Sequence, residues 1–197
     1  MKKSTIFFVF ILLSFLSFSQ PPNWTYVRSA GGVNDEEGNS IASDTFGNIY
    51  VAGFFESSTF NIGTYTFSNP GTGSGTSTDF FVAKYNSAGS VQWAIAGGGP
   101  QYEEATSITT DLAGNIYVTG FFDSPTITIG SFTLTNSNPT GNNSVFIAKI
   151  NSLGTVLWAK NSVGTLSSSL QVPRGIKTDV SGNVFLTGTF TSNNFIN

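Results

Sequence analysis

The chain has 197 residues, a formal net charge of −3, and neither cysteine nor histidine. Without these residues the chain can form no disulfide bond, no Ser-His-Asp triad, no Cys-His dyad and no histidine-ligated zinc site. The acidic balance and the absence of a basic stripe argue against nucleic acid as a partner, because binding a phosphate backbone needs clustered Lys and Arg.

The first predicted element is a secretory signal peptide over residues 1–19. A basic start, Met1-Lys2-Lys3, precedes a 13-residue apolar stretch over 6–18, and Ser17-Phe18-Ser19 supplies small residues for cleavage. An uncleaved anchor is the alternative, but 13 residues fall short of the roughly 20 that a spanning helix needs. Cleavage would leave 6 basic and 11 acidic residues, a net charge of −5. We therefore expect a secreted or cell-surface protein whose mature chain does not span a membrane.

The mature chain, residues 20–197, repeats one long sequence unit. The signature Asp-x-x-Gly-Asn followed by an apolar run begins at Asp44, Asp111 and Asp179, 67 and 68 residues apart. Tryptophan recurs with a similar period, at Trp24, Trp93 and Trp158. A fixed period of this size predicts a repeat architecture, in which each unit buries its apolar face against the next.

Within one unit, alternating apolar and polar residues predict β-strands at about 40–43, 48–55, a broken pair across 59–67, then 79–86 and 90–96. The connectors Asp-x-x-Gly-Asn and Asn-Ser-x-Gly are typical of short hairpin turns, in which Asp or Asn caps amides and Gly takes a positive φ. The segment 68–78 has the composition of a loop, and no part of the mature chain has the pattern of an amphipathic helix.

Four antiparallel strands per unit of about 65–68 residues predict an all-β protein built of β-propeller blades. The units run over about 24–92, 93–157 and 158–197, so about two and a half blades are present. A propeller typically needs four or more blades to close. We therefore expect a fragment of a larger propeller; an assembly of several chains or an open array are the alternatives.

The run Phe81 to Trp93, the pair Gly97-Gly98 and the run Ser107 to Gly120 together resemble the SBBP β-propeller repeat of bacterial exported proteins. The resemblance covers about residues 24–197 and implies an exported propeller with no shared catalytic motif. The third unit departs from the pattern, since Ser167 to Arg174 replaces the acidic segment of the first two units.

Two acidic segments, Asp35-Glu36-Glu37 and Glu103-Glu104, occupy equivalent positions, where the third unit has Gln171-Val172. Paired carboxylates serve glycoside hydrolysis and several together hold calcium, so these residues are site candidates. The favoured interpretation is that they lie in solvated surface loops. No catalytic, cofactor-binding or metal-binding residue is assigned, and no cofactor is expected.

Three further repeated positions have structural explanations that we favour over functional ones. We expect the signature aspartates to cap turns instead of holding calcium. We expect the two repeated lysines to lay their stems over aromatic rings instead of binding an anion. We expect the tryptophans to pack between blades instead of stacking on sugars. The residues concerned are Asp44, Asp111, Asp179, Lys84, Lys149, Trp24, Trp93 and Trp158.

The sequence favours a non-enzymatic exported module that binds or scaffolds an unknown protein or glycan. The alternative is part of an extracellular hydrolase acting on carbohydrate, with its site in the acidic segments or in further blades. The low charged content of 10% and the absence of histidine favour the first function, although propellers host both.

Overall fold

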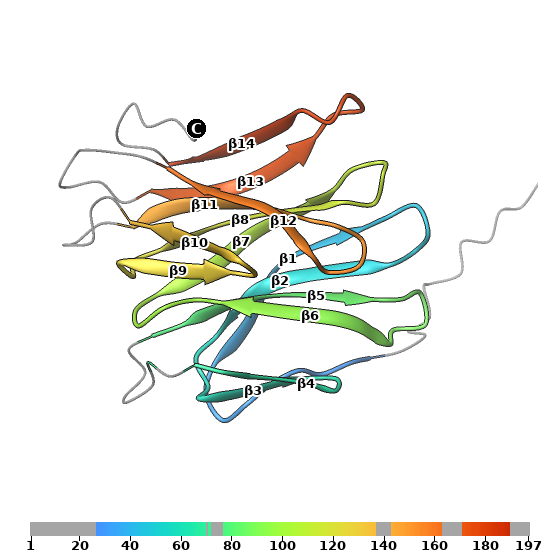
Figure 1. The fold of residues 1–197 in the computed structure, drawn as a ribbon. Coiled ribbons are helices and arrows are strands. Elements are labelled where there is room, and N and C mark those ends of the chain that lie inside the picture. The colour runs from blue at the N-terminus through green and yellow to red at the C-terminus, as the bar shows by residue number, and fades with distance from the viewer. Residues whose placement is uncertain (1–26, 70, 72–76, 137–142, 163–170, 190–197) are drawn as a thin grey trace, which may run out of the picture.

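The computed structural model describes residues 27–69, 71, 77–136, 143–162 and 171–189. The predicted signal peptide and Trp24 lie outside these residues. The described residues are folded as β-strands joined by turns, stacked in layers (Figure 1). None of them forms a helix of the length and hydrophobicity needed to cross a membrane.

Two four-stranded antiparallel sheets form the body of the molecule. Blade 1 has the strand order β1-β2-β5-β6, and blade 2 has the corresponding order β7-β8-β11-β12. Their strands are β1 (Glu36–Ser43), β2 (Ile49–Phe55), β5 (Asp79–Tyr85), β6 (Val91–Gly97), β7 (Glu103–Thr110), β8 (Ile116–Phe122), β11 (Ser144–Ile150) and β12 (Val156–Asn161). This repetition confirms the predicted propeller blades.

Smaller elements complete each layer. Along the chain, a two-stranded hairpin follows the second strand of each blade and precedes the third. These hairpins are β3 (Thr59–Ile62) with β4 (Tyr65–Ser68) and β9 (Thr126–Ile129) with β10 (Phe132–Thr135). The third unit contributes β13 (Val172–Thr178) paired with β14 (Val184–Thr189). The described residues thus form an open stack of two complete blades and part of a third, not a closed ring (Figure 1).

The hairpin turns have the predicted geometry. In the first, the Gly47 amide donates to the carbonyl of Asp44, and Gly47 has a φ of 77°. The Asp44 carboxylate accepts hydrogen bonds from the amides of Phe46 and Asn48. The turn is therefore a type I turn closed by a bulge with glycine in the left-handed region. Glycines with positive φ recur at the other four equivalent hairpins, at Gly89, Gly114, Gly154 and Gly182.

The main core lies between blade 1 and blade 2. Tyr50, Phe80 and Trp93 of blade 1 pack with Ile116 and Phe146 of blade 2, all buried. The Trp93 indole nitrogen donates to the carbonyl of Ser152, 3.1 Å away in the β11–β12 turn. This contact confirms the predicted place of Trp93 between blades.

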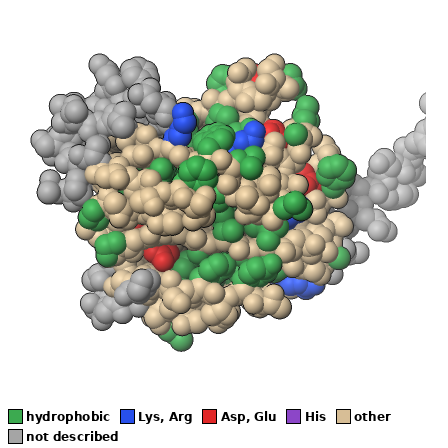
Figure 2. Space-filling view, in the orientation of Figure 1, with side chains coloured by type: hydrophobic (Ala, Val, Ile, Leu, Met, Phe, Trp, Pro, Cys, Tyr) green, Lys and Arg blue, Asp and Glu red, His purple; other side chains and the backbone are tan. Residues whose placement is uncertain are grey.

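A smaller core lies between blade 2 and the third unit. It contains Tyr117, Ile147 and Ile176, with Trp158 packed against it and partly exposed. The described part of this junction therefore uses the same strand positions as the junction between blades 1 and 2. The surface in the view of Figure 2 carries few charged side chains among polar and apolar ones, in keeping with the low charge of the sequence.

Candidate functional site

The first strands of the three units, β1, β7 and β13, form the inner side of the stack, and side chains join them to one another. The Asn39 amide donates to the carbonyl of Ala105 at 3.0 Å, and the Thr106 hydroxyl donates to the carbonyl of Pro173 at 2.8 Å. Asn39 and Thr106 are equivalent residues at bulges of β1 and β7. A bulge re-aims its side chain, here toward the next unit.

Two further bonds repeat at both junctions. The Ser40 hydroxyl accepts from the Ile108 amide, and the Ser107 hydroxyl accepts from the Ile176 amide, both at 3.2 Å. The hydroxyls of Thr110 and Thr178 donate to the main chain one unit earlier, at Ser43 and Thr110. The sequence analysis missed this pattern. Hydroxyl side chains at equivalent places of the first strands were the signal that pointed to it.

Two of the four candidate glutamates are structural. Glu103 is fully buried at the start of β7, and its carboxylate accepts from the amides of Gly99 at 2.8 Å and Ser124 at 3.1 Å. Burial raises the pKa of Glu103, and these hydrogen bonds oppose the rise. Glu36 accepts in the same way from the Gly32 amide and the Ser57 hydroxyl. The prediction of solvated acidic loops is wrong for this pair, because main-chain donors bind both carboxylates within the fold.

The last residue of the run Gly97-Gly98-Gly99, which precedes β7, donates its amide to Glu103. A Cβ on Gly99 would lie 2.5 Å from the Ser124 hydroxyl oxygen, so only glycine brings the amide close enough to Glu103. Gly99 therefore has a structural role in binding the buried carboxylate of Glu103.

Glu104, the second glutamate of its pair, lines a pocket instead. Glu104 is partly exposed, and burial followed by the charges of Glu37 and Asp123 raises its pKa. It lines a pocket of about 270 Å³ beside the junction of blade 2 with the third unit. The other lining residues combine an amide, a hydroxyl, a guanidinium and an aromatic ring; they are Asn39, Thr106, Phe121, Val172, Pro173 and Arg174. This pocket, which we call the inner-strand pocket, is the candidate functional site.

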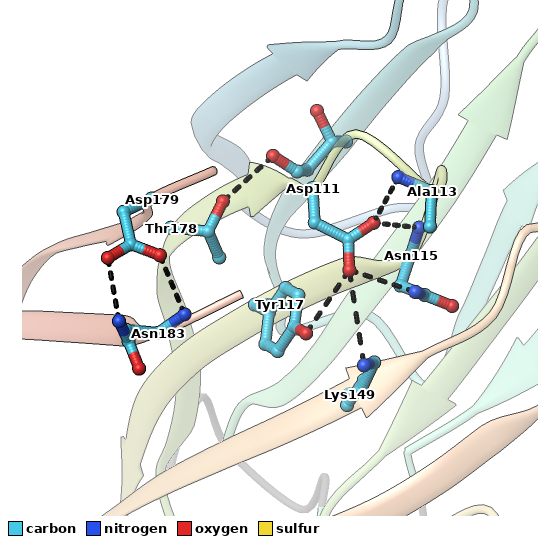
Figure 3. A network of polar contacts seen from close by, with 9 residues as sticks. Asp111, Ala113, Asn115, Tyr117, Lys149, Thr178, Asp179 and Asn183 are labelled. Atoms are coloured by element: carbon cyan, nitrogen blue, oxygen red, sulfur yellow. Dashed lines mark hydrogen bonds and ion pairs between the residues drawn. The ribbon is translucent and has the colours of Figure 1, made fainter. Parts of the chain in front are cut away.

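The signature aspartates cap their turns as predicted (Figure 3). Asp111 accepts from the amides of Ala113 and Asn115 at 2.9 and 2.8 Å, and from the Tyr117 hydroxyl at 3.2 Å. Burial raises the pKa of Asp111, but the bonds from Asn115 and its neighbours outweigh it and hold the pKa below its ordinary value. Among the described residues no group of three or more acidic side chains is placed to hold a metal ion.

The repeated lysines lie over aromatic rings, as predicted. The Lys149 ammonium is 5.0 Å from the ring centre of Tyr117 and 3.9 Å from the Asp111 carboxylate. The Lys84 ammonium is 5.6 Å from the ring centre of Tyr50 and also donates to the carbonyl of Ser152 in blade 2. Each lysine thus has structural partners at the turn side of the blades.

Asp79 is a buried carboxyl that the sequence analysis did not single out. It is 6% exposed, and its Oδ1 atom has no hydrogen-bond partner among the described residues. Burial, then the charge of Glu103, raises the pKa of Asp79 to about 7. Its counterpart in blade 2 is Ser144, whose hydroxyl bonds Asn136. Asp79 was missed because a single acidic residue at a strand start carries no pattern.

Comparison with known proteins agrees with the fold. The SBBP family model, described as a β-propeller repeat, matches residues 26–53 and 94–120. The fold and these matches define a β-propeller repeat protein. More particularly, residues 26–53 and 94–120 match the SBBP repeat that the sequence resembles.

Two curated proteins are similar to part of the chain. An uncharacterized WD repeat-containing protein of Acanthamoeba polyphaga mimivirus is 36% identical over 132 residues, which is 60% of this chain and 9% of that protein. The regulatory protein FlaEY of Caulobacter vibrioides is 30% identical over 108 residues, 55% of this chain and 11% of that protein. The chain spans about a tenth of the length of these relatives.

Proposed function

We propose that this chain belongs to an exported, non-enzymatic propeller that binds a glycan in the inner-strand pocket. The observation that carries the proposal is the composition of that pocket, in which the partly exposed ring of Phe121 lies with Glu104 and Arg174. An aromatic face packs on the apolar side of a sugar ring, while carboxylate and guanidinium groups bond pairs of hydroxyls. A peptide is the other ligand class to be tested.

The rigidity of the surrounding strands supports a binding role. The bulge residues beside the pocket, Asn39 and Thr106, are held by hydrogen bonds to the neighbouring inner strands. A site built on strands that are fixed in this way loses little conformational entropy when a ligand binds. The charge at this bulge position, by contrast, differs between units. Asn39 and Thr106 are neutral, whereas the equivalent residue of the third unit is Arg174.

Export is proposed from the sequence of residues 1–19, with the mature protein secreted or at the cell surface. N-terminal sequencing of material released by the native bacterium tests this part of the proposal. We expect a mature chain that begins near Gln20. Recovery of intact Met1-Lys2-Lys3 from extracellular material would contradict the proposed cleavage.

A carbohydrate hydrolase is the second candidate, and one observation favours it. Glu104 has a raised pKa beside the charge of Glu37, and a general acid needs a raised pKa next to a second carboxylate. Against it, Glu36 and Glu103 accept hydrogen bonds from main-chain amides, which leaves one glutamate, Glu37 or Glu104, in each acidic segment.

One experiment separates the two functions. Purified residues 20–197 are screened on glycan and peptide arrays, and binders are titrated by calorimetry and incubated for hydrolysis. We expect binding without turnover, and a loss of at least about tenfold in affinity for Glu104→Gln and Arg174→Gln. Glu56→Gln and Lys177→Gln are the matched controls outside the pocket. Turnover that disappears in Glu104→Gln would establish the hydrolase, and equal affinity of all four variants would rule out the pocket as the binding site.

A further inference from the structure

A second pocket lies along β6, the outer strand of blade 1, between the hairpin of blade 1 and the hairpin of blade 2 (Figure 1). Its volume is about 480 Å³. Apolar side chains form much of its wall, among them Phe67 of β4 and Ala94, Ile95 and Ala96 of β6. Asp79, at the start of β5, is the charged residue among the described ones that line it. We call it the β6 pocket; it lies at the junction of blades 1 and 2, not at an end of the stack.

Asp79 brings an unpaired carboxyl to this pocket. The residue is 6% exposed, and its Oδ1 atom has no hydrogen-bond partner among the described residues. A Cβ on Gly98, which also lines the pocket, would clash with that oxygen, so glycine leaves the space that the carboxyl occupies. Buried polar groups nearly always have a partner, because leaving one unpaired is costly. The exception at Asp79 indicates a place where a ligand supplies the missing donor.

Blade 2 shows that the fold does not need this carboxyl. The counterpart of Asp79 is Ser144, which is also buried but whose hydroxyl has a hydrogen-bond partner. The counterpart of Ala96 is Asn161, whose amide donates to the carbonyl of Thr135 at 2.8 Å. The same strand positions thus carry neutral, hydrogen-bonded side chains in blade 2, and a buried acid beside small apolar residues in blade 1.

The charges near Asp79 favour a cation of single charge. Burial, then the negative charge of Glu103 at the start of β7, raises the pKa of Asp79 to about 7. The other described lining residues, from β4, β6 and the β9–β10 hairpin, carry no charge. Calcium and magnesium need several oxygen ligands, and among the described residues no group of three acidic side chains is placed to hold a metal ion. One carboxylate at an apolar wall suits an organic cation with an alkyl chain.

We propose that the β6 pocket binds an alkylammonium group, such as a lysine side chain, with Asp79 as its counter-ion. The ammonium donates to the unpaired carboxylate oxygen, and the alkyl chain packs on Phe67 and the alanines of β6. Asp79 must be ionised to pair with the ammonium, so binding releases the proton that the carboxyl holds at pH values below about 7. The site is separate from the inner-strand pocket, and the proposal does not rest on glycan binding.

Calorimetric titration of purified residues 20–197 with n-pentylammonium chloride tests the proposal. We expect binding at pH 8 that weakens at least about tenfold at pH 5, where the carboxyl is protonated. At pH 6, binding should release roughly one proton, which is measured by repeating the titration in two buffers of different ionisation enthalpy. Pentan-1-ol, which has the same chain without the charge, should not bind. No binding of the ammonium at pH 8, or equal binding of the alcohol, overturns the proposal.

Two variants separate the pocket from non-specific attraction to an acidic protein. Asp79→Asn removes the charge and keeps the shape of the side chain, and Ala96→Asn introduces the larger side chain that blade 2 has at this position. Each should weaken binding at least about tenfold. Glu37→Gln, on β1 and outside the pocket, is the control for charge and should bind as the parent does. Thermal unfolding checks that every variant is folded.

The peptide acetyl-Gly-Lys-Gly-amide is titrated to distinguish the two sources of the ammonium group. Tighter binding than that of n-pentylammonium identifies a peptide ligand, and weaker binding identifies a free amine. In either case the binding should depend on Asp79. A folded Asp79→Asn variant that binds either probe as tightly as the parent overturns the proposal.

Discussion

The two internal junctions share their polar contacts and differ in their apolar ones. Both join the inner strands through a bulge residue, a serine hydroxyl and a threonine hydroxyl. The junction of blades 1 and 2 buries a core around Phe80 and Phe146, and the junction with the third unit, of which only β13 and β14 are described, buries a core around Ile176. We infer that these shared polar contacts set the register of neighbouring units, while burial of apolar side chains supplies most of the stability.

The largest expected effect on stability is at the core between blades 1 and 2. Phe146 is fully buried, and its ring centre lies 4.8 Å from that of Phe80 across the junction, with the two rings tilted. Phe146→Ala should lower the free energy of unfolding by about 3–5 kcal/mol. Urea denaturation of residues 20–197 measures the change. Phe185→Ala, which truncates an exposed ring, is the control, and an equally large effect there would contradict the assigned difference in burial.

A second prediction concerns the buried carboxyl at the same junction. Because the pKa of Asp79 is raised from its ordinary value to about 7, the folded state holds its proton more tightly than the unfolded state. Stability should therefore fall as the pH rises from about 4 to 7, and stay low above that. Asp79→Ser, which copies Ser144, should raise stability by about 2–4 kcal/mol at pH 8 and have little effect near pH 4.

Urea denaturation of parent and variant at several pH values checks this prediction. Asp123→Ser is a useful comparison, because the pKa of Asp123 is also raised by burial but Asp123 is the less buried carboxyl. A parallel pH profile for parent and Asp79→Ser would show that Asp79 is ionised in the folded protein without cost.

Much of the fold was predictable from local patterns. Strand alternation and the Asp-x-x-Gly-Asn turns depend on neighbouring residues, so the sequence placed β2, β5 and β6 within a residue or two. β1 begins at Glu36, about four residues before the predicted start, because Glu36, Glu37 and Gly38 also pair with β2. Such contacts join distant residues and leave no periodic signal.

The candidate site was predictable only in part. Glu104 was among the predicted acidic candidates, but Arg174, Asn39 and Phe121 come from three different strands that approach through the stacking of units. The sequence also could not separate Glu103 from Glu104. In a strand, adjacent residues face opposite ways, and here one faces main-chain donors while the other lines the pocket.

A third prediction tests the Asp-x-x-Gly-Asn turns that recur in blade 2 and in the third unit. Gly114 has a φ of 78°, and a Cβ there would meet only Ser152 at 3.9 Å, so any cost of substitution is conformational. Gly114→Val should destabilise by about 1–3 kcal/mol in thermal or urea unfolding. Gly182→Val, in the equivalent turn with φ 83° and open space, should show the same cost. A Gly114→Val variant that melts like the parent but loses a ligand would give this turn a binding role instead.

The smallest expected effects concern the polar contacts themselves. Ser40→Ala and Ser107→Ala each remove a hydroxyl that accepts from a main-chain amide of the next inner strand, at 3.2 Å in both cases. Each should lower stability by about 0.5–1.5 kcal/mol, by similar amounts, because the bond is the same at both junctions although the adjacent cores differ. Urea unfolding measures both, and Ser58→Ala, at an exposed hairpin position, is the control. If Ser40→Ala were neutral while Ser107→Ala was costly, the apolar core alone would hold blades 1 and 2 in register, and the polar contacts would matter only at the junction with the third unit.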